Sequence, residues 1–222
     1  MSKLDHGLEN AVLKQIRIQP VHYIPLSFLL AITVGTALLM LPFATVSGET
    51  TGFLTALFTA TTSICVTGLV VVDTYAHWSL FGQFVILLLI QIGGLGVVSV
   101  GSMIMVITRR KFFLSTRMLL GDSLNVDTRH GLLRFLKRMF RGVLIIEAAG
   151  ALLCMIRFIP LLGPWKGIWA SVFQSVSAFC NAGMDVVGPN SMIDLRSSYL
   201  LMGTTMTLIV LGGLGFVDNV EP

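Results

Sequence analysis

The sequence predicts an all-α membrane protein made of two parallel repeats, each with a span, a short re-entrant helix, a loop and a second span. Three observations predict this fold class. The 222 residues are 55% hydrophobic and 12% charged, with a mean hydropathy of +0.86, whereas soluble domains carry about 25% charged residues. Apolar runs reach the length of a membrane span, about 20 residues. One pattern of short helix, loop and span occurs twice.

Basic residues are concentrated in one stretch between apolar runs. The segment 44–78 contains neither Lys nor Arg. The positive-inside rule therefore predicts a plasma-membrane protein with a cytoplasmic N-terminus and a cytoplasmic 109–141 segment. The flanking spans explain these charges, so we expect membrane lipid and no nucleic acid as a partner. Nine of the fifteen basic residues lie in this segment: Arg109, Arg110, Lys111, Arg117, Arg129, Arg134, Lys137, Arg138 and Arg141.

The chain divides into five predicted segments. They are a cytoplasmic N-terminal segment (1–22), a first span–pore loop–span repeat (23–108), a basic cytoplasmic connection (109–141), a second span–pore loop–span repeat (142–217) and a polar tail (218–222). Proline ends helices because it lacks a backbone N–H, so we expect Pro42 to close the first span, and Pro160 and Pro164 to close the third. The four predicted spans are Tyr23–Phe43, Leu80–Ile107, Gly142–Leu162 and Tyr199–Val217.

A short apolar helix is predicted over Gly52–Thr62. At 1.5 Å per residue it would extend roughly 16 Å, about half a bilayer. It must re-enter the membrane and return through the irregular segment Ser63–Leu69, where Gly68 is able to adopt positive φ. Irregular backbone at that depth is tolerated only where it is buried in protein or lines a watery cavity. A second short helix is predicted over Gly167–Ala178, with its loop at Phe179–Gly183.

The two units align at an offset of 115 residues. TTSICVTGLVVVD, at 61–73, and SAFCNAGMD, at 177–185, then place Cys180 on Cys65 and Gly183 on Gly68. With a small additional gap, the Gly-Gly-Leu-Gly run at 212–215 lies on the run at 93–96. We expect these glycine runs to provide close helix contact, because no strand precedes them as in a nucleotide-binding loop.

A loop at the end of a half-length helix suits cation binding. Backbone carbonyls of a re-entrant loop can replace the hydration shell of a cation, and the preceding helix points its partly negative C-terminus toward it. The predicted ion-binding residues of this selectivity filter are Ile64, Cys65, Val66, Thr67, Gly68, Phe179, Cys180, Asn181, Ala182 and Gly183.

Three acidic residues are further candidates. Asp73 and Asp185 either concentrate cations at the outer mouth or cap turns. Glu147 lies inside a predicted span, where an acid is costly, so it has a functional or paired role or lies near the inner interface. Cys65 and Cys180 are better explained as small side chains buried behind the loops than as a metal pair.

TSICVTGL and SAFCNAGMD resemble the first two pore loops of the potassium uptake pore subunits of the Trk/Ktr/HKT superfamily. The resemblance extends to Phe216 and covers the family's N-terminal half. It implies potassium as substrate, held by backbone oxygens alone, with channel-like passage, sodium as a candidate coupling ion and no cofactor bound by this chain. A filter glycine favours potassium in that family, and Gly68 and Gly183 match it.

The resemblance also implies half of a four-repeat pore. Two loops cannot surround an ion, so we expect either a truncated chain or a homodimer. The family further suggests a cytosolic nucleotide-binding regulatory ring subunit, which the basic segment faces; anionic lipid explains that segment equally well. The alternative function is a non-conducting membrane fragment or structural partner of a full-length subunit. No enzyme is expected, because no Ser/His/Asp grouping or paired intramembrane acids are present.

Overall fold

The structure is a computed structural model that describes residues 23–96 and 129–214. Within these ranges it is helical, with an isolated β-bridge between Thr45 and Trp78 and no strand. The first half holds α2 (Tyr23–Leu39), η2 (Pro42–Ala44), α3 (Phe53–Ile64), α4 (Thr74–His77) and α5 (Leu80–Gly94). The second half holds α8 (Arg129–Leu162), α9 (Pro164–Phe179), η3 (Ser191–Leu195) and α10 (Tyr199–Leu214).

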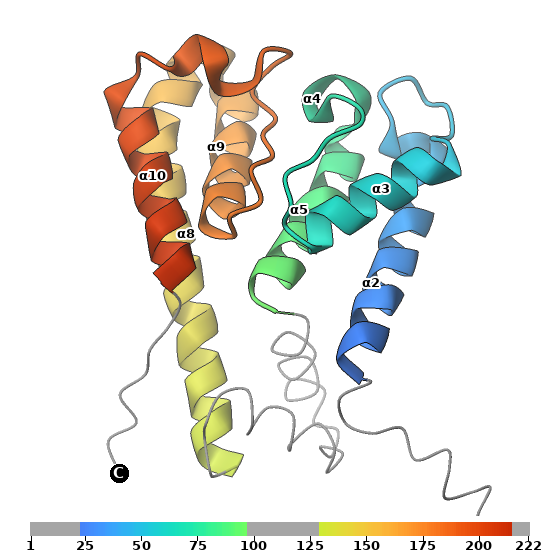
Figure 1. The fold of residues 1–222 in the computed structure, drawn as a ribbon. Helices are drawn as coiled ribbons and strands as arrows, with labels where there is room; N and C mark the ends of the chain where they lie inside the picture. Colours follow the sequence, from blue (N-terminus) through green and yellow to red (C-terminus); the bar gives the residue numbers. More distant parts are fainter. Residues whose placement is uncertain (1–22, 97–128, 215–222) are drawn as a thin grey trace, which may run out of the picture.

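The two halves lie side by side (Figure 1). In the first, α3 packs against α2 and α5; in the second, α9 packs against α8 and α10. α5 and α9 join the halves through direct contact. In each half, a short helix begins near the end of the bundle that holds α4 and η3, and a non-helical segment returns to that end (Figure 1).

Local sequence explains where the helices begin and end. Leu41 precedes a proline and is extended, with φ −68° and ψ 142°, because a proline disfavours the helical region for the residue before it. α2 therefore ends at Leu39, short of the predicted Phe43. Ser79 caps α5, its Oγ accepting a hydrogen bond of 3.3 Å from the Gly82 N–H.

The same packing contact is found within each half, between its first and its second long helix. A Cβ built on Gly35 of α2 would lie 2.8 Å from Leu89 Cδ1 of α5, and one built on Gly150 of α8 would lie 2.7 Å from Leu208 Cδ1 of α10. Small residues let helices approach closely in membranes. The offset between halves is 115 residues for the two glycines and 119 for the two leucines. The additional residues of the second half therefore lie between Gly150 and Leu208.

The second span was predicted as one helix over Leu80–Ile107, but the helix is interrupted. α5 ends at Gly94, and Gly96 has φ +81° with its N–H donating to the Gly93 carbonyl at 3.0 Å. Glycine in a left-handed conformation just past the last turn is a common helix terminator. The remainder of that predicted span, beyond residue 96, lies outside the described residues.

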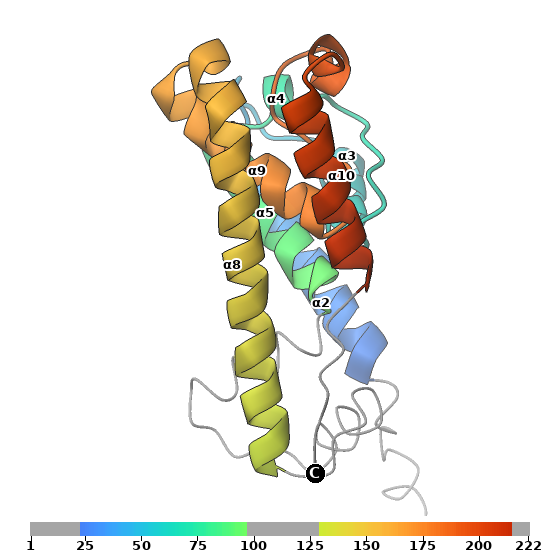
Figure 2. The ribbon, with the colours of Figure 1, turned by 90° about the vertical axis from the view of Figure 1, so that its left-hand side faces the viewer.

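The third span is longer than predicted. α8 begins at Arg129, crosses the boundary predicted between residues 141 and 142, and ends at Leu162, where the predicted third span also ends. The helix thus ends between Pro160 and Pro164, the two prolines predicted to close it. α8 extends beyond the neighbouring helices (Figure 2).

The described helices differ in their capacity to cross a membrane. Within α8, the 26-residue segment Lys137–Leu162 is long and apolar enough to do so. The apolar helices α2, α3, α5 and α10 are shorter in the part of the chain that the structure describes. For α2, α5 and α10, the predictions of full spans thus remain predictions. The cytoplasmic segment 1–22 and the tail 218–222 lie outside the described residues.

Candidate functional site

Each short helix ends in the same backbone conformation. Ile64 is the last residue of α3 and Phe179 the last of α9. The residue that follows each of them is a cysteine in the right-handed helical region: Cys65 has φ −83° and ψ 0°, and Cys180 has φ −75° and ψ −2°. The two cysteines predicted as equivalents thus have equivalent backbone positions.

Two residues with positive φ follow in both loops. The angles are 50° at Val66 and 75° at Gly68 in the first loop, and 59° at Asn181 and 69° at Gly183 in the second. Glycine adopts such angles freely, but a β-branched residue like Val66 does so only as an outlier. That strain costs about 1–3 kcal/mol and persists only where surrounding contacts hold it. The shape of these loops is therefore imposed by their environment.

Matching backbone hydrogen bonds hold the two loops. The Thr67 N–H donates to the Thr62 carbonyl at 3.0 Å, and the Ala182 N–H donates to the Ser177 carbonyl at 2.8 Å. Each bond spans five residues and turns the chain back over the last turn of its helix. The predicted site residues Thr67 and Ala182 are therefore fixed in place through their main chains.

A hydroxyl group at the same helical position fastens the far side of each loop. Thr62 Oγ1 accepts a hydrogen bond of 3.0 Å from the Leu69 N–H, and Ser177 Oγ accepts one of 3.0 Å from the Met184 N–H. Thr62 Oγ1 also lies 2.5 Å from the Thr67 hydroxyl oxygen. Thr62 and Ser177 precede the predicted filters by two residues, so their anchoring role was missed; their matching position in both repeats was the available signal.

The two loops meet at their glycines. A Cβ built on Gly68 would lie 2.6 Å from the Ala182 carbonyl oxygen, and one built on Gly183 would lie 3.8 Å from the Gly68 Cα. Beside them, Ser63 Oγ and Met184 Sδ are 3.8 Å apart. The structure thus brings together the glycine ends of both predicted loops, which are 115 residues apart in the sequence.

Glycines of the second long helices support the start of each loop. A Cβ on Gly93 of α5 would collide with the Ile64 carbonyl oxygen, and a Cβ on Gly212 of α10 would collide with the Phe179 carbonyl oxygen. Neither position admits a side chain without movement of the loop. The glycine runs were predicted to make close helix contacts; these two contacts are made with the last residue of each short helix, beside the loops.

Burial of the two loops is unequal. Cys180 is 7% exposed, whereas Cys65 is exposed. The burial predicted for both cysteines is therefore found for Cys180 and is wrong for Cys65. Met184 is 3% exposed and its equivalent Leu69 is 60% exposed. One side of the second loop is covered by the first half of the chain, and the corresponding side of the first loop is open among the described residues.

The two predicted mouth aspartates make local hydrogen bonds. Asp73 caps α4, its Oδ1 accepting a bond of 2.6 Å from the Ala76 N–H. Asp185 accepts one of 3.2 Å from the Val187 N–H through Oδ1 and another from the Ser191 hydroxyl through Oδ2. The capping alternative is confirmed at both positions. A role in concentrating cations stays a prediction.

Glu147 joins the two halves. Its side chain is 6% exposed, and its Oε1 accepts a hydrogen bond of 2.9 Å from Nε2 of Gln91 on α5. Its backbone carbonyl accepts a bond of 2.7 Å from the Ser175 hydroxyl on α9. The paired role predicted as one alternative for this acid is therefore present, with a neutral amide as partner.

Oxygen atoms are the available ligands near the two loops. Among the described residues, no three His, Cys, Asp or Glu side chains gather where they could hold a metal ion. The loops offer backbone carbonyls, with hydroxyls beside them at Thr62 and Thr67. Carbonyl and hydroxyl oxygens suit alkali cations in the way that rings of carbonyls serve potassium channels.

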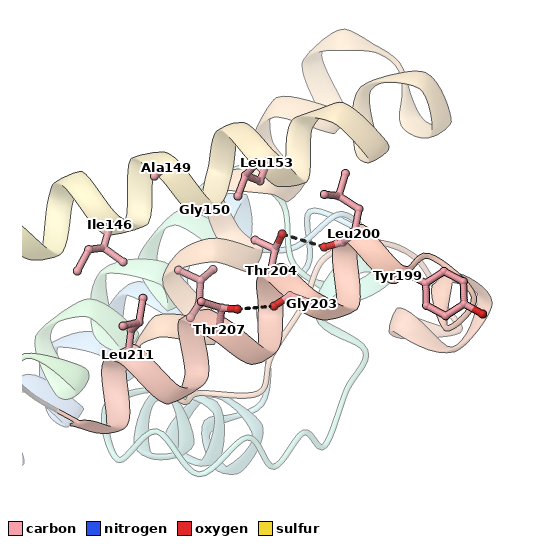
Figure 3. A pocket seen from close by; sticks show the side chains of 11 residues that line it. Ile146, Ala149, Gly150, Leu153, Tyr199, Leu200, Gly203, Thr204, Thr207 and Leu211 are labelled. Carbon is pink, nitrogen blue, oxygen red and sulfur yellow. Dashed lines mark hydrogen bonds between the residues drawn. The ribbon is translucent and has the colours of Figure 1, made fainter.

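A separate groove of about 450 Å³ lies between α8 and α10 (Figure 3). Apolar side chains such as Ile146, Leu153 and Leu211 line it. Its threonines are already engaged: Thr204 donates to the Leu200 carbonyl and Thr207 to the Gly203 carbonyl, each at 2.8 Å. No charged residue lines the groove, and most of its lining side chains are apolar.

Comparison with known proteins identifies relatives over nearly the whole chain. The family model TrkH, described as "Cation transport protein", matches residues 19–218. The potassium/sodium uptake protein NtpJ of Enterococcus hirae is 41% identical over 201 residues, which are 90% of this chain and 44% of NtpJ. The Ktr system potassium uptake protein B of Bacillus subtilis is 38% identical over 208 residues, which are 94% of this chain and 46% of that protein.

A third relative agrees with these two. The Ktr system potassium uptake protein B of Vibrio alginolyticus is 36% identical over 191 residues, 86% of this chain and 41% of its own length. The chain thus spans about half the length of the curated relatives it matches. The named relatives are uptake proteins, and the spanning-length segment of α8 supports a membrane location. By these matches, the chain belongs to the TrkH family of cation transport proteins.

Proposed function

We propose that the two loops form half of the selectivity filter of a potassium uptake pore, with α3 and α9 as its pore helices. One observation carries this proposal. Two loops share the same pattern of positive φ angles and meet at Gly68 and Gly183. A strained backbone conformation that is repeated and placed in contact with its copy supports a function common to both loops.

Helix electrostatics favour a cation at this place. The C-terminus of each short helix carries a partial negative charge from unpaired carbonyls, and α3 and α9 both end where the loops begin. The loops add backbone carbonyls that can replace a hydration shell. Cation passage then requires no acidic side chain in the filter, and the predicted filter residues 64–68 and 179–183 contain none.

Potassium is the proposed substrate, and sodium the proposed coupling ion. The support comes from the relatives, two of which are named potassium uptake proteins and one a potassium/sodium uptake protein. Two loops cannot enclose an ion, so the complete pore needs a second pair of loops. A truncated pore subunit is compatible with the coverage of about half of each relative.

The orientation and the regulatory partner are further proposals. We place the N-terminus in the cytoplasm, because nine of the fifteen basic residues lie in the segment 109–141. That segment would face a cytosolic nucleotide-binding ring or anionic lipid. Pull-down of the cytosolic subunit with and without residues 112–138 separates the two, since loss of capture on deletion supports the ring and unchanged capture contradicts it.

The experiment for the filter is the Gly68→Ser substitution. At φ +75° a side chain is strained, and its Cβ would press on the Ala182 carbonyl oxygen. We expect the ratio of potassium to sodium uptake to fall about tenfold, equal to about 1.4 kcal/mol of differential binding. Uptake is measured in liposomes that contain the purified protein, with each ion in turn.

Gly48→Ser is the matched control. Gly48 has a similar φ of +73°, but a Cβ there has no atom within 4 Å. The same substitution thus adds the same kind of backbone strain outside the loops, and selectivity should not change. An unchanged ratio of potassium to sodium uptake in Gly68→Ser, with uptake intact, would contradict the filter assignment. Absence of flux from the wild-type protein would instead favour a non-conducting role.

A further inference from the structure

The groove between α8 and α10 lies in the part of α8 that is long enough to cross a membrane. Ile146 and Leu153, on its α8 wall, belong to the apolar segment Lys137–Leu162. On its α10 wall, the hydroxyls of Thr204 and Thr207 donate to backbone carbonyls of their own helix. The groove therefore presents a mostly apolar surface at the depth of the hydrocarbon core.

A difference between the two halves accounts for the hollow. α10 corresponds to α5 at the offset of 119 residues that pairs Leu208 with Leu89, so Gly203 corresponds to Phe84. A Cβ built on Gly203 would have no atom within 4 Å. Where the first half has a phenylalanine ring, the second half has a glycine and a groove of about 450 Å³.

The corresponding side of the first half is open, although the second half packs against α5. On α5, Phe84 is 47% and Leu88 46% exposed, and Val34 of α2 is 51% exposed. Val34 and Leu88 are the equivalents of the groove residues Ala149 and Thr207. Packing of one half on the other thus leaves this side of a repeat uncovered. By the same geometry, the groove of the second half faces the surrounding membrane.

The groove has the length of a lipid acyl chain. From Tyr199 to Leu211, α10 rises roughly 18 Å at 1.5 Å per residue, and one leaflet of the hydrocarbon core is about 15 Å thick. Figure 3 shows Tyr199 at one end of the groove, and Ile146 and Leu211 at the other. Tyr199 is 91% exposed, and tyrosines are enriched where membrane meets water. The Tyr199 end is therefore the place for a headgroup.

Two arginines lie toward the Tyr199 end. Arg157 is four residues beyond Leu153, so it continues the groove side of α8 by one turn, and it is exposed. Arg196, also exposed, precedes Tyr199 by three residues. A guanidinium can form two parallel hydrogen bonds with a phosphate. Charge at this end thus complements the headgroup of a phospholipid.

We propose that the groove binds one phospholipid, with an acyl chain between α8 and α10 and its phosphate at Arg157. The chain supplies the apolar volume that Phe84 supplies in the first half. Lipid then becomes part of the contact between α8 and α10, and α10 carries Gly212, which supports the second loop. The site lies outside the two loops and is independent of which ion passes.

Gly203→Phe tests the site by placing in the second half the ring that the first half has. The wild-type chain, freed of lipid in detergent and titrated with palmitoyl-oleoyl phosphatidylglycerol, should retain one lipid in native mass spectrometry. In Gly203→Phe the dissociation constant should rise about tenfold or more. Glycerol phosphate, which carries the phosphate without a chain, should not displace the lipid.

Leu152→Phe is the matched control. Leu152 is 63% exposed on α8 and is not among the residues that line the groove, so the same ring is added at a similar depth outside the site. Its dissociation constant should equal that of the wild type. Absence of retained lipid in the wild type, or equal affinities in Gly203→Phe and Leu152→Phe, overturns the proposal.

Two neighbouring alanines test the opposite wall and serve if Gly203→Phe does not fold. Both are exposed on α8, but Ala149 lines the groove and Ala148 is not among its lining residues. We expect Ala149→Leu to weaken binding of the same phosphatidylglycerol and Ala148→Leu to leave it unchanged. Equal affinities in these two variants would likewise contradict a lipid in the groove.

The phosphate contact has a test of its own. Arg157→Gln should raise the dissociation constant of phosphatidylglycerol about tenfold. It should not change that of palmitoyl-oleoyl glycerol, which has the chains but no phosphate. Equal effects on both lipids contradict the placement of the phosphate at Arg157. None of these experiments measures transport, so their failure is separate from failure of the proposed function.

Discussion

Gly68 has less space than Gly183, although both have positive φ. At Gly68 an added Cβ would lie 2.6 Å from a backbone carbonyl oxygen, which cannot swing away as a side chain can; at Gly183 the nearest atom would be 3.8 Å away. The backbone strain of an alanine is comparable at both sites. The difference between the two substitutions therefore isolates the contact between the loops.

We expect Gly68→Ala to lower the free energy of unfolding by about 1–3 kcal/mol more than Gly183→Ala, the usual range for overpacking. Unfolding in mixed micelles, followed by circular dichroism as the denaturing detergent is increased, measures the difference. Equal losses in the two variants would mean that the loops do not press on each other at Gly68.

Sequence reasoning located the loop residues well and their surroundings poorly. The offset of 115 residues placed Cys65 with Cys180 and Gly68 with Gly183, and the backbone angles agree. It did not foresee that Cys65 is exposed and Cys180 buried. Local pattern fixes backbone conformation at a turn, but burial depends on which distant helix covers it, and the two repeats have similar sequences in different surroundings.

At the scale of elements, α5 approaches the end of α3, and α10 the end of α9, through a close contact between a glycine and a backbone carbonyl. Gly93 and Gly212 both lie where a Cβ would collide with the last carbonyl of α3 or α9. We expect Gly93→Ala and Gly212→Ala each to destabilise the protein by about 1–3 kcal/mol. Unfolding midpoints in detergent give the comparison.

Gly203→Ala provides the reference for that pair. It lies inside α10 with open space at its Cβ, and alanine is favoured over glycine within a helix by roughly 0.5–1 kcal/mol. This variant should be as stable as the wild type or more so. Destabilisation at Gly93 no greater than at Gly203 would show that the carbonyl contact is unimportant.

The helix boundaries show what pattern and composition leave open. Hydropathy predicted apolar helices where α2, α5, α8 and α10 are found, because the length of an apolar run can be read directly from the local sequence. The end of α5 at Gly94 and the start of α8 at Arg129 were not predicted. An apolar run looks the same before and after a left-handed glycine, and hydropathy marks only the apolar part of a longer helix.

At the scale of the whole molecule, a partly buried hydrogen bond joins the two halves inside the bundle. Gln91 of α5 donates to Glu147 of α8 at 2.9 Å, and the Glu147 side chain is 6% exposed. Replacing Gln91 by leucine leaves the buried Glu147 side chain without this partner, and replacing Glu147 leaves the partly buried Gln91 amide without its acceptor, a loss of about 1–3 kcal/mol. We therefore expect Gln91→Leu and Glu147→Leu each to lower stability by that amount.

The double variant tests whether the two residues act as a pair. Because it removes both polar groups together, its loss should be smaller than the sum of the single losses by at least about 0.5 kcal/mol. A double-mutant cycle on unfolding free energies measures this coupling. Strict additivity would mean that Gln91 and Glu147 contribute independently. Sequence reasoning singled out Glu147 but could not name Gln91, which is 56 residues away.

The meeting of Gly68 with Ala182 also has a consequence for biogenesis. The contact joins residues 114 positions apart, so the first loop emerges from the ribosome long before its supporting neighbour exists. At roughly 5–20 residues per second, the delay is roughly 6–23 s. During that interval the first loop lacks the contact at Gly68, one of the contacts available to hold its positive φ angles. Completion of the first loop is thus a late step that waits for translation of the second.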